Sequence, residues 1–239
     1  MPNIVFGKKN IFSIIKNSPS LVEKIYVVKG FSFDNEIYNL IKTNNLKWES
    51  IEIKEFQTIL NQNVNHQNII AYVKDFQYSQ LQDLISNEKK QTILVLDRIQ
   101  DPNNFGAIIR SSVLFGANGI VILDRNQTEV TPAVIKTSAG TAFEMPIAKV
   151  TNLANALNVL KQKGFWVYAS YLSDDSVDLS NIVFEDKKVI LIGSEGEGLT
   201  NKLVSHSDFK FKIKTSNIID SLNASVATGI ILFKANVDQ

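Results

Sequence analysis

The segment DPNNFGAIIR (101–110) combines polar side chains that could border a binding cleft. Its Asp-Pro pair predicts a turn, and Asn103 or Asn104 can cap the helix that follows. Gly106 allows a ligand or another backbone to approach the first helical turn closely. Asn104 and Arg110 are six residues apart, so they do not share one helical face perfectly, but both can border one cleft. An ordinary Asn-capped helix with a surface arginine is the alternative.

A second segment, LIGSEGEGL (191–199), places three glycines within six residues directly after an apolar run, with Glu195 in their midst. The backbone of such a loop can approach a nucleoside-like ligand closely. The glycine order G-x-x-G-x-G is not the dinucleotide-binding fingerprint, and the Gly-Lys-Ser/Thr ending of a phosphate-binding loop is absent. A tight turn that holds no ligand is the alternative.

A third segment, 213–233, carries Ser221 and Asn223 at the predicted entry to a helix. The apolar face of that helix is expected to include Val226, Ile230 and Phe233. Capping explains one of the two polar residues. The other could hydrogen-bond an adenine, a ribose or a substrate, although a pair of capping residues is the alternative.

The elements around these segments predict an α/β fold with a parallel sheet. Strands and helices alternate, and the strands are nearly continuous apolar runs, which is typical of a parallel sheet covered on both faces. Ligands of such sheets bind at the carboxyl ends of the strands, where all three segments lie. The expected strands are 92–97, 119–124, 145–150, 165–170, 188–193 and 209–213, and the expected helices are 104–116, 152–163 and those beginning at Pro132 and about Ser221.

The N-terminal third predicts a separate, smaller α/β unit. An amphipathic segment at 11–15 and a helix at 33–45 alternate with strands at 24–28, 48–53 and 68–73. A polar stretch follows, in which a short helix at 81–85 is expected. We therefore expect a domain at 1–75, a linker with local structure at 76–90 and a second domain at 91–239.

Composition limits the classes of protein that the chain can belong to. Its 239 residues contain no cysteine, which excludes disulfides, thiolate metal sites and a cysteine nucleophile. The first 20 residues lack the apolar core of a signal peptide, and no apolar run approaches the length of a membrane-spanning helix. A reducing cytoplasm therefore fits the chain.

The charge balance is nearly neutral, with 25 Lys and Arg against 24 Asp and Glu. An RNA-binding protein with this balance must concentrate its basic residues on one face. The N-terminal 30 residues carry five lysines, and a solvated lysine-rich surface is the alternative reading of them; they are Lys8, Lys9, Lys16, Lys24 and Lys29.

Together the three segments resemble the motifs of the SpoU-type (TrmH-like) family of knotted RNA 2′-O-methyltransferases. The matching stretches are DPNNFGAIIR, GSEGEGL and SLNASVATGI, and TSAGTAFEMP (137–146) resembles a further family segment. The N-terminal part resembles the ribosomal-protein-like substrate domain of the bacterial enzymes that methylate a guanosine of large-subunit (23S) ribosomal RNA. VFGKKNIFSIIKN and the VNHQNIIA stretch around His66 carry that likeness.

The resemblance implies an α/β-knot: a deep trefoil knot in the catalytic domain, with S-adenosylmethionine bound in it and no metal. It also implies an RNA substrate and a homodimer in which one site draws on both chains. The residues it assigns to the cofactor are Gly193, Ser194, Gly196, Ile213, Thr215 and Leu222. Those it assigns to catalysis and substrate are Asn104, Arg110, Glu195, Ser221 and Asn223.

Two segments depart from the family pattern. Lys214, Thr215 and Asn217 replace the proline, methionine and glycine with which the third motif usually opens, and Asn68 stands where glycine is usual. Asparagine tolerates positive φ better than most residues. These departures keep open an RNA-binding or ribosome-assembly protein whose methylation has lapsed. A further alternative is an enzyme of the same class that acts on transfer RNA or confers resistance to a ribosome-targeting antibiotic.

Overall fold

The computed structural model describes residues 3–60, 66–216 and 222–237. Its internal contacts divide the chain into two units. Unit 1 comprises Met1–Gln77 together with Val130–Glu144, and unit 2 comprises Tyr78–Glu129 together with Met145–Gln239. The domain boundaries expected at 75 and 91 stay a prediction.

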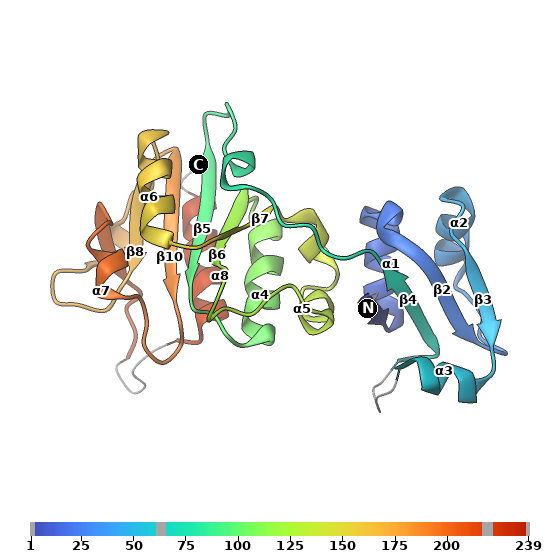
Figure 1. Cartoon of the computed structure of the whole chain (residues 1–239). Coiled ribbons are helices and arrows are strands. Elements are labelled where there is room, and N and C mark those ends of the chain that lie inside the picture. The colour runs from blue at the N-terminus through green and yellow to red at the C-terminus, as the bar shows by residue number, and fades with distance from the viewer. Residues whose placement is uncertain (1–2, 61–65, 217–221, 238–239) are drawn as a thin grey trace. The chain divides into compact units, whose positions relative to one another are not determined.

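Unit 1 is built on a mixed sheet with strand order β1-β4-β2-β3. Strand β4 runs antiparallel to β1 and β2, whereas β3 runs parallel to β2. The strands are β1 (Asn3–Phe6), β2 (Val22–Val28), β3 (Trp48–Ile51) and β4 (Ile69–Val73), and the helices are α1 (Lys8–Asn17), α2 (Asn35–Thr43) and α3 (Ile53–Leu60). Figure 1 shows this sheet and its helices in blue to cyan.

The helices of unit 1 form where apolar residues recur at helical spacing. Helix α1 buries Ile11, Ile14 and Ile15, and α2 buries Ile37 and Ile41. The expected amphipathic segment, the helix at 33–45 and the strands near 24–28 and 68–73 are therefore all present.

The strand expected at 48–53 is wrong in its last two residues. Strand β3 ends at Ile51, and α3 begins at Ile53, which is 41% exposed. Of the four residues of β3 only Ile51 is buried, because β3 lies at the edge of the sheet and pairs with β2 alone. An alternating pattern of apolar residues does not distinguish this arrangement from a longer strand.

The segment Val130–Glu144 packs with the elements of unit 1. Helix α5 (Pro132–Thr137) brings the Lys136 ammonium 5.1 Å from the centre of the Phe6 ring. Gly140 has φ +83°, and a Cβ there would lie 3.0 Å from the Ile14 side chain. Most of the stretch 137–146, which resembles a family segment, therefore belongs to unit 1.

Unit 2 contains a seven-stranded sheet with order β7-β6-β5-β10-β8-β11-β9, and every pair is parallel. The predicted α/β fold with a parallel sheet is confirmed. The strands are β5 (Gln91–Asp97), β6 (Gly119–Leu123), β7 (Ile147–Val150), β8 (Trp166–Ser170), β9 (Val177–Asp178), β10 (Lys187–Gly193) and β11 (Phe209–Lys212). The short strand β9 and the helix α7 (Asn201–Val204) were not expected from the sequence.

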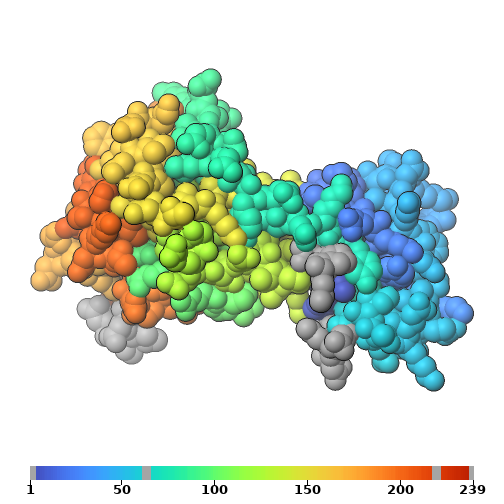
Figure 2. Space-filling view, viewed as in Figure 1, coloured from blue at the N-terminus to red at the C-terminus, as the bar shows by residue number. Residues whose placement is uncertain are grey.

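Both faces of this sheet are covered, as continuous apolar strands require. Ile93 and Val95 of β5 pack in one core with α6 (Leu153–Gln162). Leu94 and Leu96 are equally buried and point to the opposite face, because successive side chains of a strand alternate. Helix α4 (Pro102–Leu114) packs against α8 (Ala224–Val237). Figure 1 shows α6 in front of the sheet and α8 behind it, and Figure 2 shows the side chains of α6 over the near face.

The polar stretch before β5 is built into unit 2 from Tyr78 onward. The helix expected at 81–85 is a single 3₁₀ turn at Leu81–Leu84, and its two leucines join the core under α6. Leu84 packs so closely on the first residue of β6 that a Cβ at Gly119 would lie 2.4 Å from it. This part of the expected linker is thus packed rather than free.

Candidate active site

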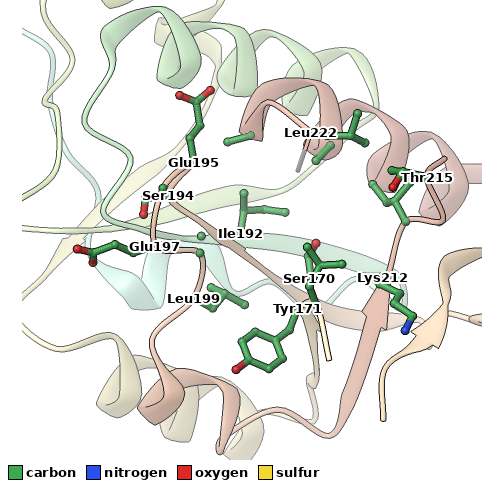
Figure 3. Close-up of a pocket in the computed structure, with 17 residues that line it drawn as sticks. Ser170, Tyr171, Ile192, Ser194, Glu195, Glu197, Leu199, Lys212, Thr215 and Leu222 are labelled. Carbon is green, nitrogen blue, oxygen red and sulfur yellow. The ribbon is translucent and has the colours of Figure 1, made fainter. Parts of the chain in front are cut away.

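A cavity of about 380 Å³ opens at the carboxyl end of the central strand β10 (Figure 3). Its walls are the loop that follows β10, the chain that follows β11 and the start of α8. Cofactor clefts typically measure about 300–1,000 Å³ and are mostly apolar with a few polar groups. The apolar wall comes from Ile192, Leu199, Ile213 and Leu222. All six residues predicted to hold the cofactor line the cavity: Gly193, Ser194, Gly196, Ile213, Thr215 and Leu222.

Gly193, the last residue of β10, allows the loop behind it to fold back on itself. A Cβ at this position would lie 2.2 Å from the carbonyl carbon of Gly198 and 2.3 Å from the amide nitrogen of Leu199. Gly198 has φ +64°, a conformation that favours glycine, and its amide donates to the carbonyl of Ser194 at 3.0 Å. The glycines therefore serve two different needs, close approach at Gly193 and a left-handed turn at Gly198.

Asp97 and Arg98, at the end of β5, bind the loop that follows β10 through side-chain hydrogen bonds and an ion pair. Asp97 is 2% exposed and accepts hydrogen bonds from the Thr200 amide at 2.9 Å and from Arg98 Nε at 3.1 Å. The Arg98 guanidinium also pairs with Glu197 and donates to the Gly198 carbonyl at 3.3 Å. Sequence reasoning missed this clamp. The only local signal, an Asp-Arg pair after a buried strand, says nothing of a partner about a hundred residues away.

The charges of the clamp reinforce one another. Burial lowers the pKa of the Arg98 guanidinium, but its hydrogen bonds and charge interactions with Asp97 and Glu197 outweigh that effect and raise the pKa above its ordinary value. Arg98 also has φ +60°, a conformation that costs free energy for a residue with a side chain. The Arg98 guanidinium therefore stays charged where it contacts Glu197 and Gly198 of the loop after β10.

Asn104, Glu195 and Asn223 come from the three separate motifs and form one hydrogen-bonded cluster. Asn104 Nδ2 donates to Glu195 Oε1 at 2.7 Å, and Asn223 Nδ2 donates to Asn104 Oδ1 at 2.8 Å. Asn223 Nδ2 also donates to Glu195 Oε1. The cluster lies at the rim of the cavity, which Glu195 itself lines. Both amides thus point their donors at one carboxylate oxygen.

The residue that caps α4 is not the one that the sequence predicted. Asp101, and not Asn103 or Asn104, is the N-cap of α4, since its carboxylate accepts from the Asn103 amide at 2.9 Å. Pro102 occupies the first helical position, so Asn104 lies inside the helix, 6% exposed, and is free to bond to Glu195. Asn223 has both tasks that the sequence suggested: its Oδ1 accepts from the Ser225 amide at 2.9 Å, while its Nδ2 joins the cluster.

One predicted catalytic residue, Arg110, is not part of this cluster. Arg110 is exposed on α4, lines neither of the cavities described for this region and forms no ion pair within the described residues. Ser221 lies outside the described residues, as does Asn217. The roles expected for Arg110 and Ser221 stay predictions.

A second cavity, of about 470 Å³, lies on the other side of the Ser194–Glu197 stretch, which lines both cavities. In Figure 3, Glu195 and Glu197 lie on the side of the loop away from Lys212. The remaining walls of the second cavity come from the loop after β5, the start of α4 and the loop after β6, namely Arg98, Ile99, Gln100, Asp101, Asn104 and Asn126. Sequence reasoning did not anticipate it.

The apolar face expected for the last helix is not its buried face. Val226, Ile230 and Phe233 are 51%, 40% and 59% exposed. The buried residues of α8 are instead Ala224, Thr228, Ile231, Leu232 and Ala235. The helix is apolar on both faces, so periodicity could not tell which one meets the sheet.

Two residues of unit 1 that the sequence singled out have structural contacts. The His66 ring lies 4.9 Å from that of Phe56, and its Nδ1 accepts from the Asn68 amide at 3.0 Å. Asn68 has φ +62°, which explains why an asparagine can stand where the resembled family has glycine. Both contacts of His66 are with neighbouring residues of unit 1.

A parallel α/β sheet with a cofactor-sized cavity at the end of its central strand, and a polar cluster at the rim, defines a cofactor-dependent α/β enzyme. The family model "SpoU rRNA Methylase family" matches residues 91–233, and the model "RNA 2'-O ribose methyltransferase substrate binding" matches residues 4–79. The chain belongs to the SpoU family. It is an RNA methyltransferase with S-adenosylmethionine as its cofactor.

Individual relatives agree with this assignment. The chain is 35% identical over 237 residues to an uncharacterized tRNA/rRNA methyltransferase homolog of Mycoplasma pneumoniae, covering 97% of this chain and 96% of the relative. It is 33% identical to a protein of the same description from Synechocystis, but spans only 62% of that relative's length. The AdoMet-bound rRNA methyltransferase from Sinorhizobium meliloti superposes with a TM-score of 0.79 at 25% identity, covering 98% of this chain and 87% of that one.

Proposed function

We propose that the enzyme transfers the methyl group to a ribose 2′-hydroxyl of RNA, and that the target is a guanosine of large-subunit ribosomal RNA. The observation that carries the ribose assignment is the Asn104–Glu195–Asn223 cluster at the rim of the cofactor-sized cavity. The match of residues 4–79 to a substrate-binding model for 2′-O ribose methyltransferases supports it.

The residues of the first cavity fit the cofactor. The Gly193 approach leaves no room for a side chain, and the apolar wall of Ile192, Leu199 and Leu222 suits a nucleoside. When bound, the cofactor supplies an activated methyl group on a positively charged sulfur. We propose that Gly193, Ser194, Gly196, Ile213, Thr215 and Leu222 hold it. In this proposal the chain after β11 passes through the loop after β10, as the trefoil knot of the resembled family implies.

The cluster can orient a hydroxyl group. Glu195 accepts both amide hydrogen bonds through Oε1, which leaves Oε2 able to accept from a ribose hydroxyl. Holding that hydroxyl in one orientation converts a bimolecular encounter into a positioned reaction. Ser221 lies two positions before Asn223 in the sequence, and we assign it to the substrate side of the site.

We propose that Arg110 takes part through a second copy of the chain. It lies one helical turn before Leu114, which is 71% exposed. Helix α4 packs against α8, which exposes Val226, Ile230 and Phe233. We propose that this apolar surface is the homodimer interface and that Arg110 reaches the partner's site. A guanidinium is always charged, so its role is to clamp a phosphate or to stabilise the developing alkoxide rather than to remove a proton.

Mixed dimers test this arrangement. Arg110→Ala and Asn223→Ala homodimers should each be nearly inactive. If Arg110 serves the partner's site, a heterodimer of the two variants contains one doubly altered site and one intact site, and should regain about half the wild-type activity per dimer. Recovery of no activity would place Arg110 and Asn223 in the same subunit's site.

Unit 1 offers the RNA-binding surface in this proposal. Two of its five early lysines are neutralised by acids, since Lys24 pairs with Glu49 and Lys29 with Glu52. Lys9 and Lys16 are exposed and form no ion pair in the part of the chain that the structure describes. They can contact phosphates, which is the usual sequence-independent part of RNA binding. An RNA target and a cysteine-free chain both fit a cytoplasmic location.

The test is to map ribose methyl groups by mass spectrometry in ribosomal and transfer RNA from cells with and without the gene. The proposal predicts the loss of one 2′-O-methylguanosine from large-subunit RNA. Loss of a methyl group from transfer RNA would favour the transfer-RNA alternative. Calorimetry tests the lapsed alternative, which the exposed Lys214 and Thr215 motivate: retained RNA binding without cofactor binding would support it.

A further inference from the structure

The second cavity lies beside the proposed methylation site, and nothing described so far gives it a ligand. We propose that it receives the unstacked base of the target nucleotide and that Gln100, Asp101 and Asn126 read it. This inference rests on the proposed ribose methylation and assigns the part of the site that selects the nucleotide. Single-stranded RNA is commonly recognised through splayed-out bases that are hydrogen-bonded on their Watson–Crick edges.

The walls of the cavity are fixed before any ligand enters. The Ile99 amide donates to Gln127 Oε1 at 2.8 Å, and the Ile99 carbonyl accepts from the Thr128 amide at 3.0 Å. The loop after β5 is thereby fastened to the loop after β6. On the opposite wall, the Arg98–Glu197 ion pair holds the loop after β10. A pre-formed site avoids much of the ordering cost of binding.

The three proposed reading residues keep hydrogen-bonding capacity free. Gln100 and Asn126 are exposed, and their side chains form no hydrogen bond with any described residue. Asn126 has φ +54°, so the loop turns sharply at the residue that lines the cavity. Asp101 uses Oδ1 to cap α4 and leaves Oδ2 without a partner among the described residues. These groups offer two amides and one carboxylate oxygen to a ligand.

The charge of the cavity selects a neutral ligand. Asp101, Glu195 and Glu197 contribute carboxylates, and Arg98 is the one basic residue in the described lining. A phosphate would be repelled by this excess of negative charge. A base with several N–H groups on one edge would be attracted.

Guanine fits this requirement better than the other bases. Its Watson–Crick edge presents N1–H and the N2 amino group side by side, so Asp101 Oδ2 can accept one of them and a side-chain carbonyl of Gln100 or Asn126 the other. Adenine, cytosine and uracil each present one donor group on that edge. The O6 acceptor of guanine would then face the amide nitrogens of Gln100 or Asn126.

The position of the cavity connects base and ribose. Asn104 lines the second cavity and donates to Glu195, which lines both cavities. A nucleotide whose base occupies the second cavity would therefore bring its ribose to the Asn104–Glu195–Asn223 cluster. The proposed base pocket and the proposed methylation site thus share the Ser194–Glu197 stretch as a common wall.

Asp101→Asn is the sharpest variant, because asparagine caps a helix about as well as aspartate and so leaves α4 intact while removing the carboxylate. The substrate is total ribosomal RNA from cells that lack the gene, methylated by the full-length protein. Asp101→Asn and Asn126→Ala should lower the methylation rate by about tenfold or more. Calorimetry should show an unchanged Kd for S-adenosylhomocysteine. The matched control is Gln162→Ala, an exposed glutamine at the end of α6, which should retain the wild-type rate.

The outcomes separate this assignment from the function on which it rests. If the wild-type protein methylates ribose but Asp101→Asn and Asn126→Ala keep its rate, the base-reading assignment is overturned and the proposed function stands. A product other than 2′-O-methylguanosine likewise overturns the assignment to guanine. If the wild-type protein methylates no ribose, the proposed function fails and takes this inference with it.

Discussion

Gly193→Ala is predicted to distort the cofactor loop, because its new methyl group would overlap backbone atoms. The Cβ would lie 2.2 Å from the Gly198 carbonyl carbon, 2.3 Å from the Leu199 amide nitrogen and 2.5 Å from the Gly198 carbonyl oxygen. Neither Gly198 nor Leu199 can relieve this overlap by a side-chain rotation. The loop Ser194–Leu199 must move away from β10.

The expected cost follows from the size of the overlap. Inserting a methyl group into a closely packed site typically costs about 1–3 kcal/mol. In the free protein the loop can relax outward, but a bound cofactor requires the original shape. The cost should therefore appear mainly in binding, as a Kd about 5-fold to 150-fold weaker, since about 1.4 kcal/mol corresponds to a factor of ten.

Isothermal titration with S-adenosylhomocysteine measures the effect without turnover. Gly196→Ala is the comparison within the same loop, because a Cβ there has no protein atom within 4 Å. Its melting temperature should match that of the wild type, whereas that of Gly193→Ala should fall. A Kd for Gly193→Ala within about twofold of the wild-type value would refute the argument from close packing.

Three further predictions concern the proposed dimer interface, the Asp97–Arg98 clamp and the loss of stability in acid. Phe233→Asp should convert the dimer to a monomer in sedimentation and abolish methylation, because a charge would replace an apolar side chain in the proposed interface; an active monomer would contradict it. Asp97→Asn should cost about 1–3 kcal/mol, since its new NH₂ group faces donors, and calorimetric melting at the wild-type temperature would count against the clamp. The Lys210 ammonium and the Ser173 hydroxyl lower the pKa of Asp175; its stabilising contribution is therefore present above about pH 4 and lost as the pH falls through the lowered pKa. Urea titrations of wild type and Asp175→Asn should differ at pH 7 and converge in acid, and a difference that persisted in acid would exclude this origin.

Much of the fold could be predicted from the sequence because the strands of unit 2 are continuous apolar runs. The expected strands at 92–97, 119–124 and 188–193 agree with β5, β6 and β10 to within a residue at either end. Burial on both faces leaves little else that such runs can form.

The elements that were missed are short or ambiguous. Helix α7 has four residues and β9 has two, which is too few for a periodic pattern. The predicted strand was extended to Ile53, where α3 begins, because the apolar residues on either side suit a strand and a helix equally. The buried face of α8 could not be found, since the helix is apolar all round.

The parts of the candidate site that could be predicted are those in which a residue contacts its own motif. Contacts between distant segments could not be predicted. Glycines after a strand indicated the loop at Gly193, and that loop lines the first cavity. The Asn104–Glu195–Asn223 bonds join residues 28 to 119 positions apart, which periodicity cannot connect. The Asp97–Arg98 clamp and the second cavity were missed for the same reason.

The most direct test of the central claim is methyl transfer from S-adenosylmethionine that carries a trideuterated methyl group. Purified protein would be incubated with ribosomal RNA from cells that lack the gene, and the RNA would be digested to nucleosides for mass spectrometry. The account predicts the deuterated methyl group on the ribose of a guanosine, with Asn104→Ala, Glu195→Ala and Asn223→Ala each losing the signal. A deuterated methyl group on a base, or an undiminished signal from all three variants, would contradict it.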